Sequence, residues 1–133
     1  MARIRAVLLD THALLWYDAT PQLLSPEVTG LLRDRGVTVF VSAISAWELA
    51  IKVRAGKLPE AQPLLADYAG TLSRLGFTEL PFAARHALAA GLLDHPHRDP
   101  FDRALATQAM QEALPLVSRD AVMQTFEGLK VIW

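Results

Sequence analysis

Short apolar runs alternate along the chain with longer stretches in which apolar residues recur every three or four positions. The apolar runs predict strands over residues 4–9, 37–41, 77–80, 114–117 and 130–133. The longer stretches predict helices over residues 12–17, 26–35, 43–55, 63–75, 82–90 and 99–112, with a short helical turn beginning at Ser118. Strands that alternate with helices predict a mainly parallel sheet covered on both faces, a three-layer α/β/α sandwich. We expect the last strand at an edge of this sheet.

Local signals support these boundaries. Ser25 and Pro26 provide an N-cap and a first helical residue, and Gly36, Gly56 and Gly76 stand where predicted helices stop. No internal repeat, low-complexity tract or long linker interrupts the pattern. The chain has 133 residues, so we expect a single domain over residues 1–133.

Composition narrows the class of protein. Hydrophobic residues make up 52% of the chain and charged residues 20%, which excludes a disordered chain. A net charge of −1 provides no overall basic field, so any contact with nucleic acid must be local. The absence of cysteine excludes disulfides, thiolate zinc sites and cysteine nucleophiles. The longest uncharged run, residues 37–47, is well short of the ~20 residues of a membrane-spanning helix. Asp10 and His12 interrupt the first apolar run, which argues against export, so we expect a cytoplasmic protein.

Acidic side chains follow two of the predicted strands, at the edge where parallel sheets bind ligands. Asp10 comes directly after the first strand, and this position suits either an N-cap of the next helix or a functional carboxylate. Asp120 follows the fourth strand, after Ser118. Ser118 is expected to cap the helical turn, with Asp120 in its first positions, where an acidic residue is favourable.

A third carboxylate, Glu48, lies on the helix after the second strand. Apolar positions cover two sides of this helix: Ile44, Trp47, Ile51 and Ala55 on one, Leu49 and Val53 on the other. A helix that is apolar over most of its circumference is predicted to be largely buried. Ser45, Glu48 and Lys52 form the polar strip between these sides. Glu48 therefore either pairs with Lys52 at i,i+4 or points into a cleft.

Two more carboxylates open the helix predicted over residues 99–112. Asp99 suits the N-cap and Pro100 the first helical position. Asp102 lines up with Leu105 and Ala106, on the stripe that a helix presses against the sheet. Two acids at a helix start also suit the helix dipole. We predict that Asp99 is the cap and that Asp102 is the working group.

Clustered carboxylates repel one another and raise each other's pKa unless a cation neutralises them. Hard divalent cations prefer carboxylate oxygen, so a site without Cys or His ligands indicates Mg²⁺ or Mn²⁺. Such a metal orients a water for attack on a phosphodiester. Arg98 and Arg103 flank the acidic helix start and either hold a backbone phosphate or form a solvated rim.

The four histidines have no spacing that favours a zinc site. His95 and His97 are expected to be exposed in a loop. His86 is expected to be packed or solvated on its helix. His12 lies close to Asp10 and either lines the same site or simply starts a helix.

Four segments together resemble the PIN-domain ribonucleases, and among them the VapC-type toxins. These are residues 8–16 (LLDTHALLW), 45–52 (SAWELAIK), 97–103 (HRDPFDR) and 116–120 (LVSRD). The resemblance covers nearly the whole chain. It implies an α/β/α sandwich and a metal-dependent endoribonuclease, the toxin component of a type II toxin–antitoxin system. It also implies a cognate antitoxin that blocks the site, and a homodimer.

The resemblance carries over to particular residues. The acidic quartet of the family falls on Asp10, Glu48, Asp102 and Asp120. Asp10 and Asp102 lead as ligands of Mg²⁺ or Mn²⁺, with Glu48 as a further ligand or as the group that orients the water. Asp99 is an additional candidate ligand. Thr11 and Ser118 match small polar residues that line the family's site.

Two other functions remain open from the residues alone. An Asp after the first strand also suits a phosphatase of the aspartyl-phosphate type, although His12 stands where that chemistry commonly uses a second Asp. Alternatively, the acids are only helix caps in a non-catalytic interaction module. Its exposed anchors would be aromatic: Trp16, Tyr17, Phe82 and Trp133.

Overall fold

Five parallel strands form the central sheet within residues 3–133, the part of the chain that the computed structural model describes. The first two residues of the expected domain lie outside this range. The strands are β1 (Ala6–Leu9), β2 (Thr38–Ser42), β3 (Thr78–Leu80), β4 (Leu116–Val117) and β5 (Val131–Ile132). Their order is β3-β2-β1-β4-β5, and every neighbouring pair is parallel. The predicted parallel sheet, with the last strand at an edge, is confirmed.

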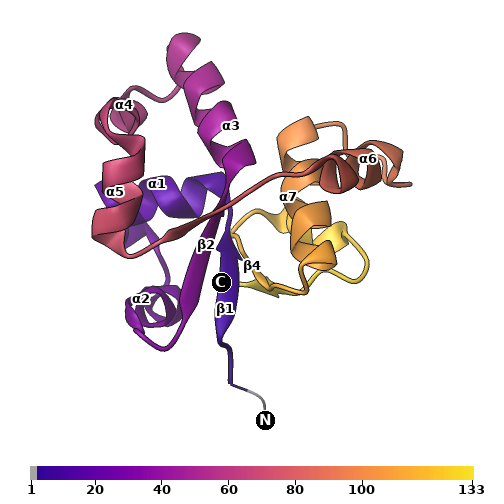
Figure 1. The fold of residues 1–133 in the computed structure, drawn as a ribbon, viewed down its shortest axis with the longest axis horizontal. Coiled ribbons are helices and arrows are strands. Elements are labelled where there is room, and N and C mark those ends of the chain that lie inside the picture. The colour runs from indigo at the N-terminus through magenta and orange to yellow at the C-terminus, as the bar shows by residue number, and fades with distance from the viewer. Residues whose placement is uncertain (1–2) are drawn as a thin grey trace.

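Helices cover both faces of this sheet, which confirms the three-layer sandwich (Figure 1). On one side lie α1 (Thr11–Ala19), α2 (Pro26–Arg33), α4 (Gln62–Ala66) and α5 (Tyr68–Leu75), and on the other α6 (Ala84–Leu92) and α7 (Pro100–Gln111). The helix α3 (Ala43–Arg54) continues directly from the end of β2. Three short 3₁₀ helices complete the described part: η1 (Pro21–Leu23), η2 (Pro59–Ala61) and η3 (Ala121–Thr125). None of the helices within residues 3–133 has the length and apolar character to traverse a lipid bilayer.

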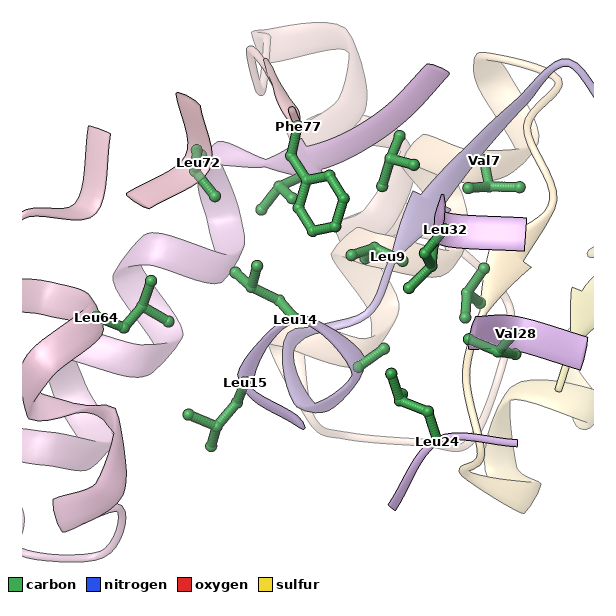
Figure 2. Packing of buried hydrophobic residues seen from close by; sticks show 14 of the residues in the cluster. Val7, Leu9, Leu14, Leu15, Leu24, Val28, Leu32, Leu64, Leu72 and Phe77 are labelled. Atoms are coloured by element: carbon green, nitrogen blue, oxygen red, sulfur yellow. The ribbon is translucent and has the colours of Figure 1, made fainter. Parts of the chain in front are cut away.

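The central strand β1 separates two apolar clusters, because successive side chains of a strand point to opposite faces. Val7 and Leu9 pack with the helices on one face, where Leu14, Leu64 and other fully buried leucines fill the space (Figure 2). Leu8 points to the other face and packs with residues of α7 and η3. Burial on both faces explains why β1 reads as a continuous apolar run.

The helix predicted over residues 63–75 is wrong in one respect, since the chain forms two helices there. The backbone of Asp67 leaves the helical region, with φ −146° and ψ 67°, and its carboxylate accepts a hydrogen bond from Gly70 N. Asp67 therefore ends α4 and caps α5. The apolar residues keep helical spacing across the break, so their pattern alone does not reveal it.

Other boundaries differ from the predictions by at most three residues. The strand β1 begins at Ala6, and β4 begins at Leu116. The helix α2 ends at Arg33, because Asp34 adopts an extended backbone. The helix α6 starts two residues later than predicted, after Ala83.

The prediction that α3 is buried on both apolar sides is wrong. Leu49 is fully buried, but the side carrying Trp47 and Ile51 faces outward, with Trp47 58% exposed. The prediction that four aromatic side chains are exposed anchors is also wrong. Trp16, Tyr17 and Trp133 are only partly accessible because they pack against the larger apolar cluster, and Phe82 is half-buried as well.

We predict that Asp67→Ala lowers the free energy of unfolding by about 1 kcal/mol, because it removes the cap of α5. Asp67→Asn keeps a capping side chain and should stay within a few tenths of a kcal/mol of wild type. Urea denaturation measures both changes. Equal losses in the two variants would show that the ion pair of Asp67 with Arg74, and not the cap, is the stabilising contact.

Candidate active site

The register of the sheet brings the ends of three strands to one level. Leu9 at the end of β1 pairs with Val41 of β2 and with Val117 of β4. The backbone N–H of Asp10 donates to the Val117 carbonyl oxygen at 3.0 Å. The residues that follow these strands therefore meet at the carboxyl edge of the sheet, as the sequence predicted.

Asp10 is both a helix cap and a pocket residue. Its Oδ1 accepts a hydrogen bond from Ala13 N at 2.7 Å, which caps α1. The residue is only 7% exposed. Burial raises the pKa of Asp10 to about 6, and nearby Asp102 adds to the rise, whereas the Ser118 hydroxyl and the Ala13 N–H oppose it. The carboxylate is therefore held where its charge is costly.

Glu48 points from α3 toward the same edge and is 3% exposed. Its two oxygens are bound separately: Thr11 Oγ1 donates to Oε1, and Lys52 Nζ pairs with Oε2 at 2.7 Å. Ser45 Oγ lies 3.0 Å from Thr11 Oγ1. The predicted i,i+4 pair is therefore present, and it coexists with a position in the acidic pocket.

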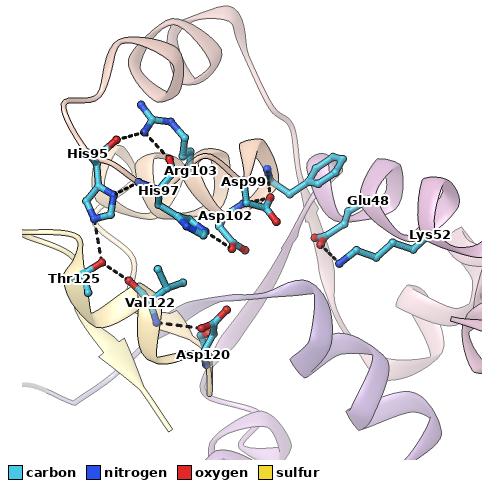
Figure 3. Close-up of polar contacts among 12 residues, drawn as sticks. Glu48, Lys52, His95, His97, Asp99, Asp102, Arg103, Asp120, Val122 and Thr125 are labelled. Carbon is cyan, nitrogen blue, oxygen red and sulfur yellow. Dashed lines mark hydrogen bonds and ion pairs between the residues drawn. The ribbon is translucent and has the colours of Figure 1, made fainter. Parts of the chain in front are cut away.

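The start of α7 supplies two carboxylates with different surroundings. Asp99 is the N-cap and accepts from Phe101 N at 2.8 Å and from Asp102 N at 3.2 Å, as predicted. Asp102 instead points toward the space shared with Glu48 and Asp120 (Figure 3). Partial burial raises the pKa of Asp102, a hydrogen bond with His97 opposes this rise, and the neighbouring carboxylates add to it.

His97 is a site residue that the sequence reasoning missed. Its Nε2 lies 2.8 Å from Asp102 Oδ2, and its backbone N–H donates to His95 Nδ1. His95 stacks on Phe126, with ring centroids 4.0 Å apart. The prediction that both histidines are simply exposed is wrong, because these contacts leave each of them half-buried. The only signal was the position of His97 five residues before Asp102.

The capping prediction after β4 is reversed. Asp120, and not Ser118, caps the turn: its Oδ1 accepts from Val122 N at 3.0 Å. Ser118 Oγ accepts from Asp120 N at 3.1 Å. Ser118 is buried next to Asp10 and does not line the acidic pocket itself.

One pocket of about 110 Å³ gathers the predicted carboxylates. We call it the acidic pocket, and its lining is Asp10, Thr11, His12, Glu48, Lys52, Asp99, Asp102, Leu105 and Asp120. The atoms of this lining that could bind a metal are mostly oxygen, which suits a hard cation. Within residues 3–133, no three acidic or histidine side chains lie close enough together to form a preformed metal cage. Mg²⁺ fits such a site, because it binds one or two carboxylates and keeps several waters.

The two arginines beside α7 differ from the predicted phosphate clamp. The Arg103 guanidinium donates to the carbonyl oxygens of Ala90, Leu93, His95 and His97. Four of its five N–H groups are thus committed to the protein, so Arg103 fastens the loop before α7. Arg98 is exposed and lines a different pocket, between α3 and α6. We therefore withdraw both residues as phosphate ligands of the acidic pocket.

Comparison with known proteins agrees with this architecture. The model of the PIN domain matches residues 7–129. Ribonuclease VapC22 of Mycobacterium tuberculosis is 30% identical over 117 residues, which is 86% of each chain.

Two solved structures share the fold. VapBC2 from Rickettsia felis, crystallised with a DNA fragment from its promoter, superposes with a TM-score of 0.67 at 18% identity, over 96% of this chain and 98% of that one. A toxin–antitoxin complex from Klebsiella pneumoniae gives a TM-score of 0.59 at 15% identity, over 96% of both chains. At these identities the similarity establishes the fold.

We predict that Asp10→Asn stabilises the protein in the absence of divalent metal. The folded pKa of Asp10, about 6, is above the ordinary 3.8. This group therefore contributes stability below pH 4 that is lost as the pH rises through about 6. Asn keeps the cap and carries no charge, so at pH 8 the variant should gain up to about 3 kcal/mol.

Thermal unfolding in EDTA at pH 4 and pH 8 measures this difference. The gain should appear at pH 8 and vanish near pH 4. Added Mg²⁺ or Mn²⁺ should raise the Tm of wild type more than that of Asp10→Asn. A variant that is less stable than wild type at pH 8 in EDTA would mean that the charge of Asp10 is already compensated.

Proposed function

The chain belongs to the PIN-domain family, and we propose that it is a metal-dependent endoribonuclease, the toxin of a type II toxin–antitoxin pair. The observation that carries this proposal is the convergence of Asp10, Glu48, Asp102 and Asp120 on one pocket from four separate segments. Its 30% identity to ribonuclease VapC22 supports RNA as the substrate.

Asp10 and Asp102 are the proposed metal ligands, since both carboxylates have a raised pKa. Burial is the main cause for each, and neighbouring carboxylates add to it: Asp102 for Asp10, and Asp99, Glu48 and Asp120 for Asp102. A bound Mg²⁺ or Mn²⁺ would activate a water and stabilise the leaving oxygen of the phosphodiester. His97 positions the Asp102 carboxylate through its Nε2. Thr11 and Lys52 fix the orientation of Glu48, which would serve as a further metal ligand or orient a water beside the metal.

A cognate antitoxin is the proposed protein partner. The structural relatives from Rickettsia felis and Klebsiella pneumoniae are a VapBC pair and a toxin–antitoxin complex. An antitoxin that covers the acidic pocket would keep both RNA and metal-bound water out of it. The same partner explains how a cell tolerates a ribonuclease of this class.

A homodimer is the second proposed assembly, and we propose that the exposed apolar side chains form its interface. Of the five large hydrophobic side chains that are exposed among residues 3–133, four lie on α3 and α6: Trp47, Ile51, Leu88 and Leu92. Both helices line one pocket of about 340 Å³. Exposed apolar groups gathered in this way mark an interaction surface.

We predict cleavage of single-stranded RNA in Mg²⁺ or Mn²⁺ that stops in EDTA. Loss of a residue that merely supports a ligand typically costs about 10–100-fold, so Asp102→Asn should lose at least ~100-fold in kcat/KM. Asp99→Asn is the matched control, because Asn also caps a helix, and it should lose less than ~10-fold. The cut ends in total RNA are mapped first, and a short RNA that contains the mapped site is the substrate for measuring these values of kcat/KM.

The outcomes separate the alternatives. A metal-independent activity, or none, contradicts the proposed function. A greater loss of kcat/KM in Asp99→Asn than in Asp102→Asn would instead indicate that Asp99 is the metal ligand and Asp102 is not.

We predict that Leu92→Glu converts a dimer to a monomer, because a charge at a side chain 84% exposed disfavours an apolar interface without disturbing the fold. Leu23→Glu is the control, since Leu23 is also exposed but lies in η1. Sedimentation velocity measures the oligomeric state. Identical sedimentation of Leu92→Glu and wild-type dimer would place the interface elsewhere.

A further inference from the structure

A second pocket, of about 300 Å³, opens beside the acidic pocket. We call it the aromatic pocket, and its lining is Asp10, His12, Trp16, Arg119 and Asp120. Three of these residues, Asp10, His12 and Asp120, line both pockets. The two pockets are therefore adjacent, and a ligand that reaches the carboxylates through one group can place its neighbouring group against Trp16.

Trp16 forms a fixed wall of the aromatic pocket. It lies on α1, packs against the larger apolar cluster, and meets the Trp133 ring edge-on with centroids 5.9 Å apart. The exposed His12 ring lies 5.6 Å from it, and the Arg119 guanidinium carbon lies 5.8 Å from its ring centroid. A held aromatic ring with two exposed planar groups around it presents flat surfaces to a ligand.

The charges around this pocket limit what it can hold. Asp10 and Asp120 disfavour a phosphate, and Arg119 disfavours a cation. Within residues 3–133, the Arg119 side chain has no hydrogen-bond or ion-pair partner and its guanidinium lies beside the Trp16 ring, so its five N–H donors are available. An uncharged planar heterocycle with hydrogen-bond acceptors satisfies all of these conditions, and a nucleobase is such a group.

We infer that the aromatic pocket binds one base of a single-stranded RNA, next to the phosphodiester held at the acidic pocket. Trp16 is the stacking platform, and His12 and Arg119 confine the base and donate to its acceptors. The inference rests on the proposed ribonuclease function. It assigns part of the sequence preference of cleavage to residues outside the carboxylate set.

The test is a double-mutant cycle between the protein and an abasic RNA. The probe is a short single-stranded RNA that wild type cuts, prepared as a series with one abasic position at a time. Its Kd is measured by fluorescence anisotropy in EDTA. His12→Ala and Arg119→Ala change exposed side chains, so both variants should fold. The control is Arg35→Ala, which changes an exposed arginine just before β2, at the edge of the sheet away from both pockets.

For the base that enters the pocket, we expect its removal to weaken binding to wild type by about 5- to 100-fold, the range of base stacking on aromatic side chains. The same removal should weaken binding to His12→Ala and Arg119→Ala by a smaller factor, because each variant lacks one of the groups that contact the base while Trp16 remains. Arg35→Ala should respond as wild type does. Losses that simply add at every abasic position would overturn the inference.

Cleavage rates in Mg²⁺ distinguish the two proposals. If RNA is cut but the cycle shows no coupling, the base subsite is wrong and the ribonuclease stands. If no RNA is cut, short homopolymers of each base replace the probe in the binding assay. If His12→Ala and Arg119→Ala weaken the binding of a homopolymer, the base subsite stands without catalysis. If neither variant changes its Kd, the base subsite is wrong.

Discussion

The repulsion between carboxylates held at one edge of a parallel sheet is the constraint on which this protein depends. Three strands end at the same level, and carboxylates from four segments line one pocket at this edge. Burial raises the pKa of Asp10 and Asp102 because each must give up water beside like charges. The surrounding groups moderate this cost only in part: Lys52 on Glu48, His97 on Asp102 and backbone N–H groups on the caps. The remaining repulsion is what the proposed divalent cation would relieve.

Capping and site formation turn out to be the same arrangement here. Asp10, Asp99 and Asp120 each accept a backbone N–H at a helix start, and each also lines the acidic pocket. For Asp10 a short connection forces this coincidence, because the single residue between β1 and α1 is both the first residue after the strand and the residue before the helix. In each case the cap fixes the carboxylate through its Oδ1 atom.

The fold and most of the pocket were predictable, because both follow from local patterns. The alternation of apolar runs with helical stretches predicted the parallel sheet. The acids that follow the strands predicted a site at its carboxyl edge. The rest depends on contacts distant in the chain. Nothing near Arg103 indicates that its guanidinium would collect four carbonyl groups, and nothing in the apolar spacing of α3 shows which of its two sides is covered. His97 lies in a loop as predicted, but its partial burial was not predictable, because its partner Asp102 is in place only once α7 has packed.

The Arg103 network has a consequence for how this chain can diverge. Surface loops ordinarily tolerate inserted or deleted residues, since few contacts depend on their length. The loop between α6 and α7 is different, because the Arg103 side chain binds carbonyl groups from Ala90 to His97 and so constrains the length of the loop. An added residue there would shift His97 away from Asp102 and release the carboxylate. Drift in loop length should therefore accumulate elsewhere in the molecule, while this connection keeps a constant number of residues for as long as the acidic pocket is under selection.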